Sequence, residues 1–143
     1  MIQFYYCLIK FIKYIFYYEG ANPDLIDTNG NTVTHIMVIH DNMMMFDLAV
    51  ECGGTIATRN NLNLNPLTVA AYLAHKDMFF HIANIEREVY WQIGNVCCSA
   101  YPIEQMDSIN SSSGELQTES ALNLIVFGVS LYCIYKFIII IIL

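Results

Sequence analysis

The chain has few basic residues, and their distribution excludes one class of partner. Six Lys and Arg stand against thirteen Asp and Glu. Only Arg59, Lys76 and Arg87 lie within the stretch from Glu19 to Glu119, which holds all of the acidic residues. Nucleic-acid binding needs positive charge gathered on one face of the protein. We therefore expect no nucleic-acid partner.

Spacings typical of metal sites and disulfide frameworks are also missing. The five cysteines contain no C-x-x-C pair, and the four histidines do not fall at zinc-ligand spacing. We expect free thiols, and we expect no metal site, no cofactor, no catalytic residues and no enzymatic activity. The cysteines are Cys7, Cys52, Cys97, Cys98 and Cys133, and the histidines are His35, His40, His75 and His81.

What the sequence does contain is one pattern that occurs twice. DTNGNTVTH begins at Asp27, and NNLNLNPLT begins at Asn60. This spacing matches the period of ankyrin repeats, about 33 residues, whose signature is T-P-L-H-x-A. TVTH and NPLT each carry about half of that signature. The repeat-signature residues are Gly30, Thr32, His35, Gly53, Asn65, Pro66 and Leu67.

Each copy is expected to form a pair of short antiparallel helices. Thr32 and Asn65 carry side-chain oxygens that can cap a helix start, and Pro66 suits a first helical position. His35 is expected to form hydrogen bonds within the repeat stack. Two such pairs are fewer than the three repeats usually needed for stability, so we expect a longer solenoid. The expected apolar faces are Val33, Ile36 and Met37; Met44, Met45, Leu48, Ala49 and Cys52; Pro66, Val69 and Ala70; and Phe79, Ile82 and Ala83.

After Glu86 the residue types change from helix formers to strand formers. β-branched and aromatic residues, interrupted by Gly94-Asn95, predict a hairpin or two short strands joined there. Trp91 and Tyr101 are expected to be the anchors through which this element packs. The alternative is that these aromatics only cover the end of the solenoid. The expected linker and assembly residues are Tyr90, Trp91, Gly94, Tyr101 and Pro102.

Several longer phrases resemble a known family. Ankyrin-type repeats followed by WQIGNVCCSAYPIEQMDSIN and SALNLIVFG resemble the cytosolic part of vanilloid-type transient receptor potential (TRPV) channels. VIHDNMMMFDLAVECG, DMFFHIANIEREVYWQIGNV and AYPIEQMDSIN are most similar to the invertebrate sensory members related to Nanchung and Inactive. The resemblance extends over roughly Gly20 to Gly128.

This resemblance implies the last ankyrin repeats and the pre-membrane linker of a calcium-permeable cation channel subunit. It implies other TRPV-like subunits as partners in a homotetramer or heterotetramer. It also implies association with the plasma or ciliary membrane, with the ankyrin part on the cytoplasmic side. These residues include no pore loop and no selectivity filter, so the implied role is assembly and gating rather than conduction.

The predicted architecture is mainly α. It consists of an ankyrin solenoid fragment of about two repeats, a small β-hairpin linker and a C-terminal hydrophobic helix. We expect a hydrophobic leader at 1–18, ankyrin repeats at 19–52 and 53–86, the linker at 87–110 and a polar loop at 111–120. The segment 121–143 has Lys136 as its only charge and is long enough to span a bilayer.

The two ends carry a separate expectation. Met1 to Tyr18 and Val129 to Leu143 resemble nothing in the family and are rich in residues with A/T-rich codons. We expect both to be absent from the mature transcript. If the tail is made, it should insert into a membrane. A small tail-anchored membrane protein and a soluble ankyrin-repeat adaptor are therefore the alternative functions.

Overall fold

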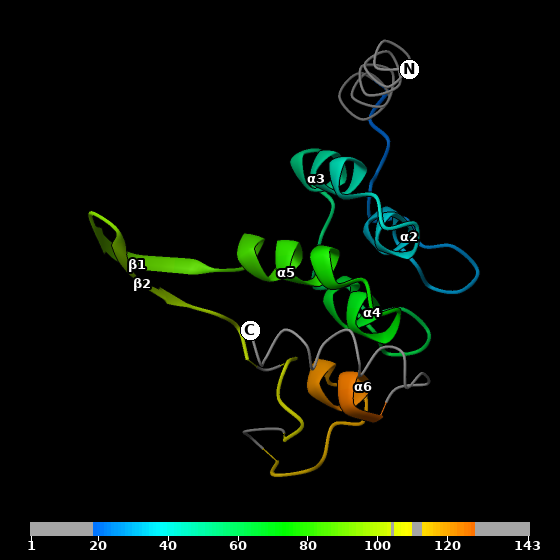
Figure 1. Cartoon of the computed structure of the whole chain (residues 1–143). Helices are drawn as coiled ribbons and strands as arrows, with labels where there is room; N and C mark the ends of the chain where they lie inside the picture. Colours follow the sequence, from blue (N-terminus) through cyan, green and yellow to red (C-terminus); the bar gives the residue numbers. More distant parts are fainter. Residues whose placement is uncertain (1–18, 104, 110–112, 128–143) are drawn as a thin grey trace. The chain divides into compact units, whose positions relative to one another are not determined.

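The computed structural model describes residues 19–103, 105–109 and 113–127 (Figure 1). The predicted leader and residues 128–143 lie outside these ranges. The expectation that both ends are absent from the mature transcript therefore concerns residues outside the described part of the chain. The chain divides into two compact units, residues 1–66 and 67–143. Each unit is described by itself.

The first unit contains helix α2, Val33–Ile39, and helix α3, Met43–Glu51. The two helices pack against each other (Figure 1). Thr32 is the N-cap of α2, as predicted, and the Asn42 side chain caps α3 by accepting from the Met45 N–H at 3.2 Å. Local capping therefore determines where both helices start.

The turn after α2 is a Schellman motif. The Asn42 N–H donates to the Met37 carbonyl, and the Asp41 N–H donates to the Val38 carbonyl, both at 3.0 Å. Asp41 has a φ of 51°, in the left-handed region that this motif requires at its first non-helical residue. The motif satisfies carbonyls at the helix end and reverses the chain into α3.

Helix α4, Pro66–Tyr72, starts at the last residue of the first unit, and its other residues belong to the second unit. Helix α5, Lys76–Ile85, follows it. Strands β1, Glu88–Ile93, and β2, Val96–Ala100, follow as an antiparallel hairpin, and helix α6, Ala121–Phe127, comes last. The described part is thus a mixture of helices and one two-stranded sheet. The predicted hairpin is present, with its turn at Gly94-Asn95.

The backbone repeats with the period seen in the sequence. Helices α4 and α5 begin one repeat period after α2 and α3. The residues with positive φ repeat in the same way, although only some of them are glycine. These residues form pairs, and the two members of a pair lie in the same type of turn, once in each copy of the repeat. The pairs are Gly20 (65°) and Gly53 (94°), Gly30 (77°) and Asn63 (61°), and Asp41 (51°) and Ala74 (57°).

The buried faces of the first two helices differ from the predicted ones. In α2 the buried residues are Thr34, His35 and Val38, whereas Val33, Ile36 and Met37 are half-buried. In α3, Phe46 is fully buried and Met44 is exposed. Polar Thr34 and His35 can be buried because partners in the following loop satisfy their hydrogen bonds.

The predicted faces of α4 and α5 agree better with the structure. Val69, Ala70, Phe79, Ile82 and Ala83 are all buried. The signature residues Asn65, Pro66 and Leu67 are buried at the start of α4, where the helix begins directly after Asn65.

No helix within the described ranges is long and apolar enough to cross a membrane. Helix α6 covers only the first residues of the predicted hydrophobic helix, and the remainder lies outside the described residues. In the predicted polar loop, Leu116 pairs with Ile109 in an isolated bridge. The Gln117 N–H also donates to the Ser108 carbonyl at 2.8 Å.

Candidate functional site

Two loop turns of the first unit have the same hydrogen-bonding pattern. Asp27 Oδ1 accepts from the N–H groups of Asn29, at 2.8 Å, and Asn31, at 2.7 Å. Asn60 Oδ1 accepts in the same way from Leu62, at 3.0 Å, and Leu64, at 3.1 Å. The hydrogen bond from the Asn31 backbone is the main cause that lowers the pKa of the Asp27 carboxyl.

These two turns bind each other directly. The Asn61 N–H donates to the Asn29 carbonyl at 3.0 Å, and the Asn61 amide group donates to the Thr28 carbonyl at 3.2 Å. The Asn60 amide group donates to Asn31 Oδ1 at 3.0 Å. Asparagine side chains and backbone groups therefore form hydrogen bonds that join the two turns.

His35 connects the same two loops from the inside. The ring is fully buried. Its Nδ1 accepts from the Thr32 N–H at 3.2 Å and lies 2.8 Å from Thr32 Oγ1, while its Nε2 lies 3.1 Å from the Leu64 carbonyl oxygen. Only the neutral tautomer with its proton on Nε2 fits both sides, because Nδ1 must accept and Nε2 must donate. His35 thus caps α2 and holds the next loop at once.

Burial lowers the pKa of His35, and this predicts a pH dependence of stability. In the unfolded chain the imidazole titrates near 6.5. Below that pH the unfolded state binds a proton that the folded state does not, so stability falls as the pH falls. The slope from this one group is at most about 1.4 kcal/mol per pH unit. We expect urea unfolding midpoints to decrease between pH 7.5 and pH 5, with no such decrease from this group above pH 7.5.

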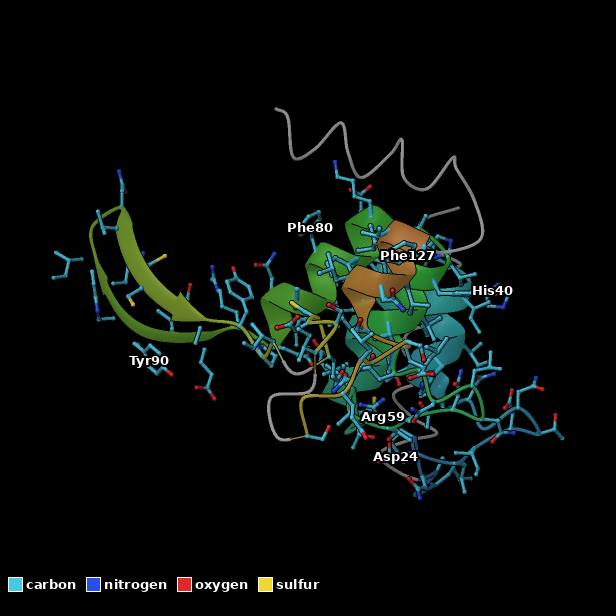
Figure 2. The ribbon with its side chains drawn as sticks, turned by 90° about the horizontal axis from the view of Figure 1, so that it is seen from below. Asp24, His40, Arg59, Phe80, Tyr90 and Phe127 are labelled. Carbon is cyan, nitrogen blue, oxygen red and sulfur yellow. The ribbon has the colours of Figure 1, made fainter. Side chains whose placement is uncertain are left out.

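The control for this titration is a histidine at the surface. His40 lies exposed at the end of α2 (Figure 2). The variant His35→Gln should lose most of the decrease, whereas His40→Gln should keep it. An unchanged pH profile in His35→Gln would show that other groups cause the acid destabilisation.

The hairpin is the second candidate site. Trp91 pairs with Cys98 and Gln92 pairs with Cys97, and a bulge lies between Val89 and Trp91. Gly94 has a φ of 59° at the first central position of the two-residue turn. The turn types that join strands in this way need a positive φ there, which explains the glycine.

Trp91 and Tyr101, the expected packing anchors of the hairpin, are only partly covered within this chain. Trp91 is 49% exposed and Tyr101 is 42% exposed, and Tyr90, on the hairpin ribbon in Figure 2, is 68% exposed. Every position of β1 is exposed. The physical reason is that a two-stranded sheet offers an aromatic side chain only one neighbouring strand to cover it. Pro102 is also exposed.

Nothing in the described part of the chain brings together three or more residues of the types that bind metal ions. Cys52, Cys97 and Cys98 are not part of disulfide bonds. Cys7 and Cys133 lie outside the described ranges. At the junction of α5 and β1, burial raises the pKa of the Glu86 carboxyl.

Curated proteins that are similar to this chain are named as transient receptor potential cation channels of subfamily V. The chain is 28% identical over 100 residues to transient receptor potential cation channel subfamily V member 5 of Rattus norvegicus, an alignment of 63% of this chain. The Mus musculus protein of the same name also aligns at 28% over 100 residues. Subfamily V member 6 of Rattus norvegicus is 29% identical over 109 residues, or 69% of this chain.

This chain is similar to TRPV cation channels. It spans only 14% of the length of each of these relatives. No family model matches the chain. The similarity supports a TRPV-like relationship and thus the coarser part of the resemblance inferred from the sequence.

The asparagine contacts between the loops were not predicted from the sequence. The signal was present, because Asp27 and Asn60 lie one repeat period apart and both begin an Asx-type turn. The fourth position of each turn then has positive φ, occupied by Gly30 in one copy and Asn63 in the other. Asn61 has a different residue at its equivalent position, Thr28, so the repeat comparison could not reveal its role.

Proposed function

We propose that this chain is a cytosolic fragment of a calcium-permeable TRPV-like channel subunit that serves assembly and gating. The similarity to subfamily V members 5 and 6 supports the channel relationship. The backbone turns that recur at the ankyrin period support the assignment of residues 19–86 to two ankyrin repeats of a solenoid. The subtype related to Nanchung and Inactive is part of this proposal and rests on the sequence phrases alone.

The exposure of the hairpin carries the proposed role. Val89, Ile93 and Val96 are exposed as well as the aromatic residues, so apolar surface lies on a small, isolated sheet. Apolar and aromatic surface of this kind, bordered by polar groups, is typical of protein interfaces. Glu86 and Glu88 supply acidic groups at its border. We propose that the hairpin contacts a neighbouring subunit of a homotetramer or heterotetramer held at the membrane.

A chimeric channel tests this function. The 100 aligned residues of the rat subfamily V member 5 subunit would be replaced by the matching residues of this chain. We expect tetramers at the cell surface and calcium entry. Tyr90→Ala and Trp91→Ala should each reduce tetramer yield about tenfold, which is the effect of losing one interface hot spot worth about 1–2 kcal/mol. Leu116→Ala, at a residue 79% exposed and outside the hairpin, is the matched control.

The stability of the chain itself provides the second measurement. Because half of the Trp91 side chain is already exposed, Trp91→Ala should lower the free energy of unfolding by about 1–2 kcal/mol. A fully buried aromatic residue would cost about 3–5 kcal/mol. A normal tetramer yield in chimeras with either hairpin substitution would refute the assembly role, whatever the unfolding result.

A further inference from the structure

The hairpin carries two adjacent thiols that the proposed assembly role does not use. Cys97 and Cys98 are both exposed and both free. They occupy consecutive positions in β2, opposite Gln92 and Trp91 in the middle of the ladder. A pair of accessible thiols that are neighbours in sequence can never separate, whatever the rest of the chain does.

A disulfide between these two cysteines is incompatible with the strand. Consecutive side chains of a strand point to opposite faces of the sheet. A disulfide needs Cβ atoms about 3.8 Å apart and Cα atoms usually about 4.4–6.8 Å apart, whereas neighbouring Cα atoms are about 3.8 Å apart. Closing the bond therefore requires the backbone at Cys97 and Cys98 to leave its extended conformation.

The cost of leaving that conformation is small here. An isolated two-stranded hairpin is marginally stable in water, and β1 is exposed at every position. The pairs lost would be Gln92 with Cys97 and Trp91 with Cys98, which lie between the turn and the bulge. Loss of these central pairs would leave only Ile93 with Val96 next to the turn.

We propose that Cys97 and Cys98 form a redox switch, in which oxidation to a disulfide between them opens the β1–β2 hairpin. The oxidant is a low-molecular-weight disulfide such as oxidised glutathione. One cysteine thiolate attacks a sulfur of that disulfide, forming a mixed disulfide and releasing one thiol. The neighbouring thiolate then attacks the protein sulfur of the mixed disulfide and releases the second thiol.

Protons and electrons balance in this thiol–disulfide exchange. Two protein thiols lose two protons and two electrons, and one oxidised glutathione becomes two reduced glutathione molecules, which take up both protons. The product is strained, because its Cα atoms are closer than disulfides prefer, and strained disulfides are more easily reduced. The switch is therefore reversible by excess reduced thiol.

The fluorescence of Trp91 can report whether the hairpin is open or closed. Trp91 is the single tryptophan of the chain, and it pairs directly with Cys98. The experiment incubates the full chain in buffers of defined oxidised to reduced glutathione ratio. It then measures intact mass, disulfide-linked peptides, tryptophan emission and amide hydrogen exchange. We expect a Cys97–Cys98 disulfide, a shift of Trp91 emission and exchange over residues 88–100 that is faster by about tenfold or more.

Variants separate this switch from general oxidation. Cys97→Ser and Cys98→Ser should each keep, in oxidising buffer, the exchange rates that residues 88–100 have in the reduced chain. Cys52→Ser should respond like the parent chain, and exchange of α3 amides should not change in any variant. Excess dithiothreitol should restore the reduced exchange pattern.

Three outcomes would overturn the proposal. One is a Cys97–Cys98 disulfide with unchanged exchange in the hairpin. The second is stable glutathione adducts on the separate thiols, and the third is disulfides between chains. Loss of the assembly surface on oxidation rests on the proposed channel role. The exchange experiment contains no channel, so the switch and that role can fail independently.

Discussion

Replacing Gly30 with alanine should lower the free energy of unfolding by about 3 kcal/mol, the sum of two costs. Gly30 has a φ of 77°, which costs a residue with a side chain about 1–2 kcal/mol. A Cβ there would also lie 2.5 Å from Asn61 Oδ1 and 2.8 Å from the Asn61 backbone nitrogen. Overpacking of this kind costs about 1–3 kcal/mol. Because that nitrogen donates to the Asn29 carbonyl, relief of the clash would break a contact between the loops.

Gly20 provides the matched control. It has a similar φ of 65°, but a Cβ at this position would meet nothing within 4 Å. Gly20→Ala should therefore show the conformational cost alone, about 1–2 kcal/mol. The measurement is urea unfolding followed by far-UV circular dichroism. Equal losses in the two variants would show that the close approach of Asn61 to Gly30 contributes nothing.

The largest loss should come from His35→Ala, about 3–5 kcal/mol. The substitution removes a fully buried ring and leaves the Thr32 N–H and the Leu64 carbonyl without the ring nitrogens that they contact. Each buried polar group without a partner costs about 1–3 kcal/mol, and the cavity adds to this. The loss should affect both loops, because the ring holds the start of α2 and the loop that follows α3.

His40→Ala is the comparison for this variant. His40 is exposed and follows α2 in the same turn, so its removal should change stability by about 0.5 kcal/mol or less. Urea unfolding at pH 8, well above the usual pKa of a histidine side chain in an unfolded chain, avoids a contribution from His35 protonation. A loss below about 1 kcal/mol for His35→Ala would mean that the loops are held together mainly by Asn60 and Asn61.

Some features of the fold were readable without coordinates because they depend on neighbours in sequence. The N-cap at Thr32, the start of α4 after Asn65 and the two-residue turn at Gly94-Asn95 were all predicted. Each is determined by a short-range hydrogen bond or by a φ angle that few residue types adopt. Such preferences act between near neighbours and do not need the rest of the chain.

Burial was predicted less well, and in both directions. Met44 was expected inside and is exposed, whereas Phe46 was not expected and is fully buried. Periodicity places an apolar stripe on a helix, but the packing partner decides which side of the stripe is covered. Helix α3 is short, and a small rotation about its own axis changes which of its side chains face α2.

The sequence by itself therefore determined the repeat period, the helix and strand types and the turns, because these follow from local capping, φ preference and residue spacing. The tertiary structure alone decided that a neutral His35 and asparagine side chains join the loops, and that Trp91 stands half exposed on the hairpin. Burial and hydrogen-bond partners that are distant in sequence depend on which segments meet. Which segments come into contact depends on how the whole chain packs, and no short stretch determines it alone.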